Sequence, residues 1–238
     1  MASEPNSIHF TVRNMTDLRL LQITDSAFPL GGFAFSSGLE SAAKLGLIAD
    51  LAAFRKYLQN YLHQTARSEI PFVKSAFELT VVGYQDLELL YKRFNAFVTI
   101  PTMRQASVTQ GRSLLLAFRA GYPDVCVNDF TGWLQERKLT PHFVPTFGVC
   151  VKLAGLPIKD ALFGYCYMAL RDQISAAVRL GLLGPHEGQR VLWKLIDEAP
   201  EVLSAVEDLS YHQAVRTCVS LDIAQASHSR LYSRMFRS

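Results

Sequence analysis

The chain has six histidines and four cysteines, the side chains that most often bind transition metals or act as nucleophiles. The histidines stand at positions 9, 63, 142, 186, 212 and 228, and no two of them are four residues apart. The cysteines, at positions 126, 150, 166 and 218, form no Cys-x-x-Cys pair and no recognisable zinc spacing. We therefore predict no metal site in this chain, and we interpret His142 and Cys150 as core residues.

Carboxylates offer little more for catalysis. The only adjacent pairs are Asp197 with Glu198 and Glu207 with Asp208, and each is typical of a solvated helix end. A general acid and base would need two carboxylates with different environments at one cleft. The sequence thus favours a protein that is not an enzyme.

The most unusual segment is residues 25–40, which reads DSAFPLGGFAFSSGLE. Two adjacent glycines after a proline permit backbone angles closed to other residues, and Ser36 or Ser37 could cap a helix running toward Leu45. A loop that enters a helix N-terminus is an anion site in principle. However, no Gly-Lys-Ser/Thr follows, and the Gly-x-Ser-x-Gly spacing of a nucleophile elbow is missing.

Two interpretations of this loop stay open at the level of sequence. In one, Phe28, Phe33 and Phe35 all pack on the core; in the other, Phe33 or Phe35 is exposed as an anchor for a partner, because aromatic residues dominate interface hot spots. An enzymatic alternative would place a substrate anion at the glycines, with Asp25 or Glu40 as the base.

Arginines mark two further segments. Arg171 and Arg179 are separated by about two helical turns that contain small residues, which is typical of a buried helix with close neighbours. From residue 212 onward the chain has four arginines, at 216, 230, 234 and 237, against the single acid Asp222, so this part carries the whole net charge of +3. We expect the tail 227–238 either to fray or to become ordered when a partner binds.

Helical periodicity dominates the rest of the chain. Bulky residues recur on one helix face at Phe54, Tyr57, Leu58, Tyr61 and Leu62, then at Leu87, Leu90, Tyr91 and Phe94, and again from Val191 to Ala199, where Pro200 is expected to end the helix. Residues 77–82 and 142–152 would suit strands equally well, and their helical neighbours decide in favour of helix. The pattern predicts one compact all-α domain of eight to ten helices, residues 17–238, after an irregular arm, residues 1–16.

Composition excludes several classes of protein. With 49% hydrophobic and 19% charged residues the chain has a large core and is not disordered. A net charge of +3 is too small for a dedicated nucleic-acid binder. The absence of a signal-like start and of a long uncharged segment predicts no membrane association and a cytoplasmic, reducing location.

Taken together, these segments resemble the UreF family of urease accessory proteins. The resemblance rests on residues 20–40, with a leucine-rich start, a Pro-x-Gly turn, an aromatic, a serine and Gly-Leu-Glu. It continues through residues 104–112, 142–148, 175–180 with 188–192, and 221–224 with 228–238, in the order and spacing of the family.

The resemblance implies an all-helical, non-enzymatic homodimer that binds the accessory protein UreD (UreH) and recruits or modulates the GTPase UreG, so that nickel is inserted into the urease apoprotein. Nickel and GTP would then be bound by partners, with no cofactor held by this chain itself. The positions that match the family's GTPase-recruiting side are Phe33 and Arg234. The full set of candidate partner-binding residues is Phe33, Phe35, Ser37, Glu40, His228, Arg230, Tyr232 and Arg234.

Three departures from the family pattern bear on these contacts. Phe35 replaces a common tyrosine and so lacks a hydroxyl, Ser229 stands where a glutamate is frequent, and residues 181–185 differ in the turn after Arg179. The alternative function is a helical protein-interaction module unrelated to urease.

Overall fold

The computed structural model describes residues 12–82, 84–122 and 126–237, and in these ranges the chain is helical without a β-strand. This confirms the predicted all-α fold. Eleven α-helices and two short 3-10 helices are found in the described ranges, close to the number expected. The helices are α1 (Val12–Thr24), α2 (Leu39–Lys44), α3 (Leu51–Ser68), α4 (Ile70–Val82), α5 (Tyr84–Phe97), α6 (Pro101–Gly121), α7 (Val127–Glu136), α8 (Phe143–Leu153), α9 (Ile158–Arg179), α10 (Pro185–Ser204) and α11 (Val219–Ser227), with η1 (Gly32–Ala34) and η2 (His228–Arg230).

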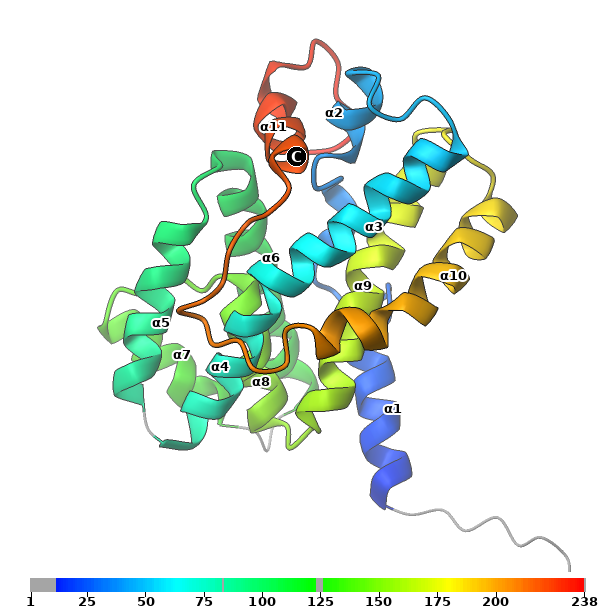
Figure 1. Cartoon of the computed structure of the whole chain (residues 1–238). Coiled ribbons are helices and arrows are strands. Elements are labelled where there is room, and N and C mark those ends of the chain that lie inside the picture. The colour runs from blue at the N-terminus through cyan, green and yellow to red at the C-terminus, as the bar shows by residue number, and fades with distance from the viewer. Residues whose placement is uncertain (1–11, 83, 123–125, 238) are drawn as a thin grey trace, which may run out of the picture.

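Helix α9 runs through the middle of the molecule and organises the other helices (Figure 1). Helices α1, α3 and α10 pack along it, while α8 contacts α4 most extensively and also packs against α6. The short helix α2 lies beside α11 at one end of the bundle, so segments from the two ends of the sequence meet there (Figure 1).

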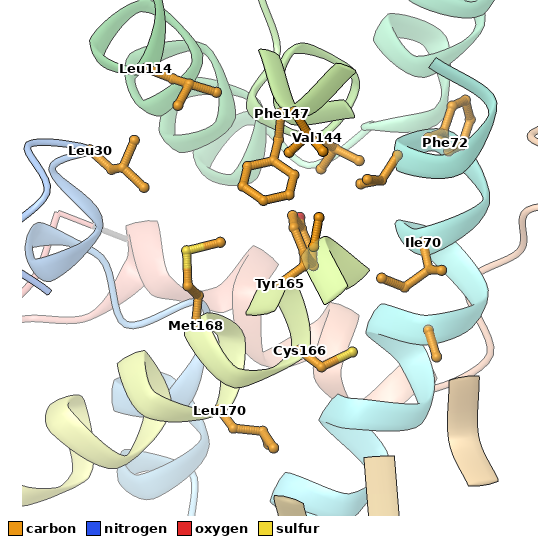
Figure 2. Packing of buried hydrophobic residues seen from close by; sticks show 14 of the residues in the cluster. Leu30, Ile70, Phe72, Leu114, Val144, Phe147, Tyr165, Cys166, Met168 and Leu170 are labelled. Atoms are coloured by element: carbon orange, nitrogen blue, oxygen red, sulfur yellow. The ribbon is translucent and has the colours of Figure 1, made fainter. Parts of the chain in front are cut away.

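The core lies where α9, α8 and α4 converge. Phe147 from α8 packs edge-on against Tyr165 from α9, with 5.3 Å between ring centres, and Met168 and Ile70 extend the same apolar cluster (Figure 2). Each of these side chains is almost completely buried. The hydrophobic effect of this shared core holds helices that are far apart in sequence.

Close contact between α4 and α8 depends on a glycine. A Cβ atom added at Gly148 would lie 2.2 Å from the carbonyl oxygen of Val73, so only glycine permits this approach of the two backbones. The segment 142–152, which suited a strand as well as a helix, forms most of α8 and its N-cap residue His142. Its apolar residues pack on all sides of the helix.

The predicted helix faces are largely confirmed. Phe54, Leu58 and Leu62 on α3 are buried, as are Leu87 and Leu90 on α5. The segment 77–82 is the second half of α4, and residues 142–152 belong almost wholly to α8. Periodicity of apolar residues thus predicted α3 and α5 correctly, and the helical neighbours predicted the helical state of residues 77–82 and 142–152 correctly.

Two boundaries differ from the sequence prediction. Helix α1 begins at Val12 and so includes the last residues of the predicted arm, because a residue added to an existing helix gains a hydrogen bond without a new nucleation cost. Residues 1–11 lie outside the described residues. Pro200 does not end α10, which continues to Ser204 with Val202 and Leu203 buried. Burial of that last turn outweighs the hydrogen bond that proline cannot donate.

Candidate functional site

All eight candidate partner-binding residues come together at the end of the molecule formed by α2 and α11. Four belong to the loop 31–38 and the first turn of α2, and four belong to η2 and the tail that follows it. Helix α11 contacts α2 directly, which places the tail over the loop (Figure 1). The sequence separates these groups by almost two hundred residues.

Glycines shape the loop. Gly31 and Gly38 have positive φ angles of 75° and 93°, in the region that favours glycine. Gly38 occupies the N-cap position of α2, and the hydroxyl of Ser36 accepts a hydrogen bond from the main-chain amide of Glu40 in the first turn at 3.5 Å. The amide Nε2 of Gln225 on α11 donates a hydrogen bond to the carbonyl oxygen of Ser37 at 3.0 Å, which attaches α11 to the loop.

The three phenylalanines of this loop have different environments. Phe28 packs edge-on against Phe118, and Phe35 is buried in the core, as the first interpretation predicted. Phe33 is 67% exposed, as the second interpretation predicted for an anchor. The exposed ring is nevertheless supported, because the guanidinium of Arg179 lies 3.6 Å from its centre and donates a hydrogen bond to the Phe33 carbonyl oxygen.

Glu40 is a buried carboxylate, 1% exposed, at the start of α2. It accepts hydrogen bonds from the main-chain amides of Met235 and Phe236 at 2.8 and 3.2 Å, from His228 Nε2 at 3.2 Å and from Lys44 Nζ at 3.1 Å. Burial by itself raises the pKa of Glu40, but these four donors outweigh burial and lower the pKa below its usual value.

Three of the candidate residues do not lie at the surface of this structure. Phe35, Glu40 and His228 are buried, so here their side chains support the surface, and their part in partner binding stays a prediction. The tail is attached to the loop in this structure, because Phe236 is buried and its main-chain amide donates a hydrogen bond to Glu40.

Four of the candidates present exposed side chains: Phe33, Arg230, Tyr232 and Arg234. Ser37 is half-buried and shares a hydrogen bond with Tyr61. The surface that a partner can reach at this end therefore combines two aromatic rings with two arginines, a composition that protein interfaces favour.

A cavity of about 620 Å³ lies beneath this loop, lined by residues from the loop and from α3, α6 and α9. Three carboxylate residues line it, Asp25, Glu69 and Asp172, and burial raises the pKa of Glu69 and Asp172. Tyr165 donates to Glu69 at 2.7 Å, and Arg171 pairs with Asp172 at 2.7 Å. Glu69 is the C-cap residue of α3, and no motif around it distinguishes it in the sequence.

The described residues contain no group of three or more His, Cys, Asp or Glu side chains arranged to hold a metal ion. Burial raises the pKa of Cys166 to about 12 and also raises that of Cys150, so neither thiol is a ready nucleophile at neutral pH. His142 is fully buried, as predicted, with Nε2 3.0 Å from Asn95 Oδ1 and Nδ1 3.2 Å from Ser107 Oγ.

In the enzymatic alternative, both candidate bases already accept hydrogen bonds from main-chain amides of this chain. Glu40 holds the tail, and Asp25 Oδ1 accepts a hydrogen bond from the main-chain amide of Ala27 at 2.6 Å.

Among the helices that the structure describes, none combines the length and the apolar character needed to cross a membrane.

Comparison with known proteins identifies the family of this chain. The UreF family model matches residues 48–196. A urease accessory protein UreF of Paenarthrobacter aurescens is 31% identical over 222 residues, covering 93% of this chain and 97% of the relative. Urease accessory protein F of Arabidopsis thaliana is 30% identical over 224 residues, 91% and 90% of the two chains, and that of Oryza sativa subsp. indica is 29% identical over 221 residues, 90% and 82%. The family match over more than half of the chain and the similarity along nearly all of it establish that this protein belongs to the UreF family of urease accessory proteins.

Proposed function

We propose that this protein is a scaffold in urease maturation that acts through protein contacts and has no catalytic site of its own. It binds the accessory protein UreD (UreH) and recruits or modulates the GTPase UreG, so that nickel reaches the urease apoprotein. Nickel and GTP are bound by these partners, and the scaffold works as a homodimer in the cytoplasm.

The surface formed by Phe33, Arg230, Tyr232 and Arg234 is the proposed contact with the GTPase. The observation that carries this assignment is Phe33, a large apolar ring that is 67% exposed and yet held by Arg179. An ordered, exposed aromatic loses little conformational entropy when it becomes buried in an interface. The neighbouring arginines add donors for carboxylates of a partner.

The proposal is tested by light scattering coupled to size-exclusion chromatography of the full chain, alone and with UreD and GTP-loaded UreG. Phe33→Ala and Arg234→Ala are expected to keep the helical fold and the dimer but to weaken UreG recruitment by about tenfold or more, as hot-spot residues do.

Two exposed residues elsewhere serve as matched controls. Trp193→Ala removes a ring that is 74% exposed on α10, and Arg119→Ala removes an exposed arginine near the end of α6. Recruitment that is equally strong in all four variants would contradict the assignment of this surface. A chain that forms no complex with UreD or UreG under any nucleotide condition would contradict the proposed function itself.

A further inference from the structure

The last described residues of the chain are bound through three consecutive main-chain amides. The amide of Met235 donates to Glu40 Oε1 at 2.8 Å, and that of Phe236 donates to Glu40 Oε2 at 3.2 Å. The amide of Arg237 donates to the carbonyl oxygen of Ala34 at 2.8 Å. Main-chain contacts of this kind fix the course of a segment whatever its exposed side chains are.

The acceptor of the first two bonds is well placed to hold a segment that has no secondary structure of its own. Both Glu40 oxygens are used, one for each amide, and the carboxylate is 1% exposed, so water does not compete for them. Hydrogen bonds to an ionised acceptor are about twice as strong as bonds between neutral groups.

Side chains of the tail add to the same attachment. Phe236 is 5% exposed, and its ring centre lies 4.2 Å from the guanidinium of Arg179, the group that also supports Phe33. His228, at the start of the tail, is fully buried against Glu40. The carboxylate thus contacts both ends of the segment 228–236.

We infer that Glu40 is a positioning residue, whose carboxylate holds the C-terminal segment against α2 and thereby places Arg230, Tyr232 and Arg234 beside Phe33. The segment between the two attached ends carries these three exposed side chains, so their location follows from the attachment. Only the use of this surface by a partner rests on the proposed function; the attachment itself is a property of the isolated chain.

The inference is tested by hydrogen–deuterium exchange of the full chain, read by mass spectrometry in two peptides. One covers the tail from residue 231 to 237, and the other covers α8. Glu40→Gln keeps the size of the side chain but turns an NH₂ group toward one main-chain donor. Loss of a charge-assisted bond predicts exchange in the tail that is about tenfold faster or more, with α8 unchanged.

Glu88→Gln is the matched control, because Glu88 pairs with Lys92 and Arg137 at 2.6 Å on α5, away from the tail. It is expected to leave exchange in the tail unchanged. If Glu40→Gln accelerates exchange in α8 as well, the substitution affects the whole fold. The inference is then tested by exchange of the tail in a Met235→Pro variant. This second variant removes one amide donor from an exposed tail residue and leaves the buried glutamate intact.

Faster exchange confined to the tail in either variant supports the inference. Unchanged tail exchange in a folded Glu40→Gln or Met235→Pro protein overturns it. Binding of UreG, measured separately, distinguishes this result from the proposed function: a released tail with undiminished UreG recruitment would leave the attachment established and the partner surface refuted.

Discussion

The guanidinium of Arg179 lies between two aromatic rings, 3.6 Å from the centre of Phe33 and 4.2 Å from that of Phe236. One ring belongs to the loop before α2 and the other to the C-terminal tail, so a residue at the end of the central helix α9 joins the two segments of the site. This arrangement keeps Phe33 ordered although most of its surface is in water.

Arg179→Ala is therefore expected to lower the free energy of unfolding by about 1–2 kcal/mol, since two cation–π contacts at a partly exposed site are worth about 0.5–1 kcal/mol each. Urea denaturation followed by circular dichroism measures the change. Arg190→Ala, on the exposed part of α10, should alter stability by less than about 0.5 kcal/mol. Equal effects of the two substitutions would show that the ring contacts contribute nothing.

Gly148→Ala is expected to destabilise the protein by about 3 kcal/mol or more, because the new methyl group would collide with the Val73 carbonyl oxygen and force α8 away from α4. Gly132→Ala provides the comparison, since an added Cβ in α7 meets no atom within 4 Å. That change should be neutral or stabilise by up to about 1 kcal/mol through helix propensity. Thermal unfolding of both variants tests the pair, and a stable Gly148→Ala protein would contradict the close packing.

His142 should titrate in acid. Burial, with a smaller contribution from the positive charge of Arg104, lowers the pKa of His142 to about 4. Because the folded-state pKa lies below the unfolded value of about 6.5, stability is complete above pH 6.5 and declines by about 3 kcal/mol as the pH falls toward 4. Nuclear magnetic resonance of the ring should show a neutral His142 at pH 6, assigned with His142→Asn, and a midpoint near 6.5 would contradict this environment.

Glu40 is an acid and His142 is a base, but the stability that each contributes is lost as the pH falls. Its pKa is lowered in the folded protein, so the stability it contributes is present above the unfolded value of about 4.3 and is lost as the pH falls through the lowered folded-state pKa. The groups that face it are His228 from η2 and Lys44 from its own helix.

The expected result is a difference in unfolding free energy between the natural protein and Glu40→Gln that is largest near pH 6 and shrinks below pH 4. Urea denaturation at several pH values measures it. The raised pKa values of Glu69 and Asp172 affect both proteins equally and cancel in the difference. A difference that stays constant down to pH 3 would mean that the charge of Glu40 does not hold the tail.

Much of the fold was readable from local pattern. The apolar faces of α3 and α5 predicted which side chains are buried, because a helix places residues three and four apart on one side whatever surrounds it. The end of α10 was not readable, because the preference of Pro200 is local while the burial of Val202 and Leu203 depends on other helices.

For the candidate site, the amino-acid sequence predicted two segments: the glycine- and phenylalanine-rich loop and the arginine-rich tail both have compositions unlike the rest of the chain. Which of their residues face outward follows from the packing of the folded chain. Phe33 and Phe35 are two positions apart and equally apolar, yet one is exposed and one buried. Glu40 has the charge of a surface residue but lies beneath the tail, because burial depends on the neighbours that the fold brings from almost two hundred residues away.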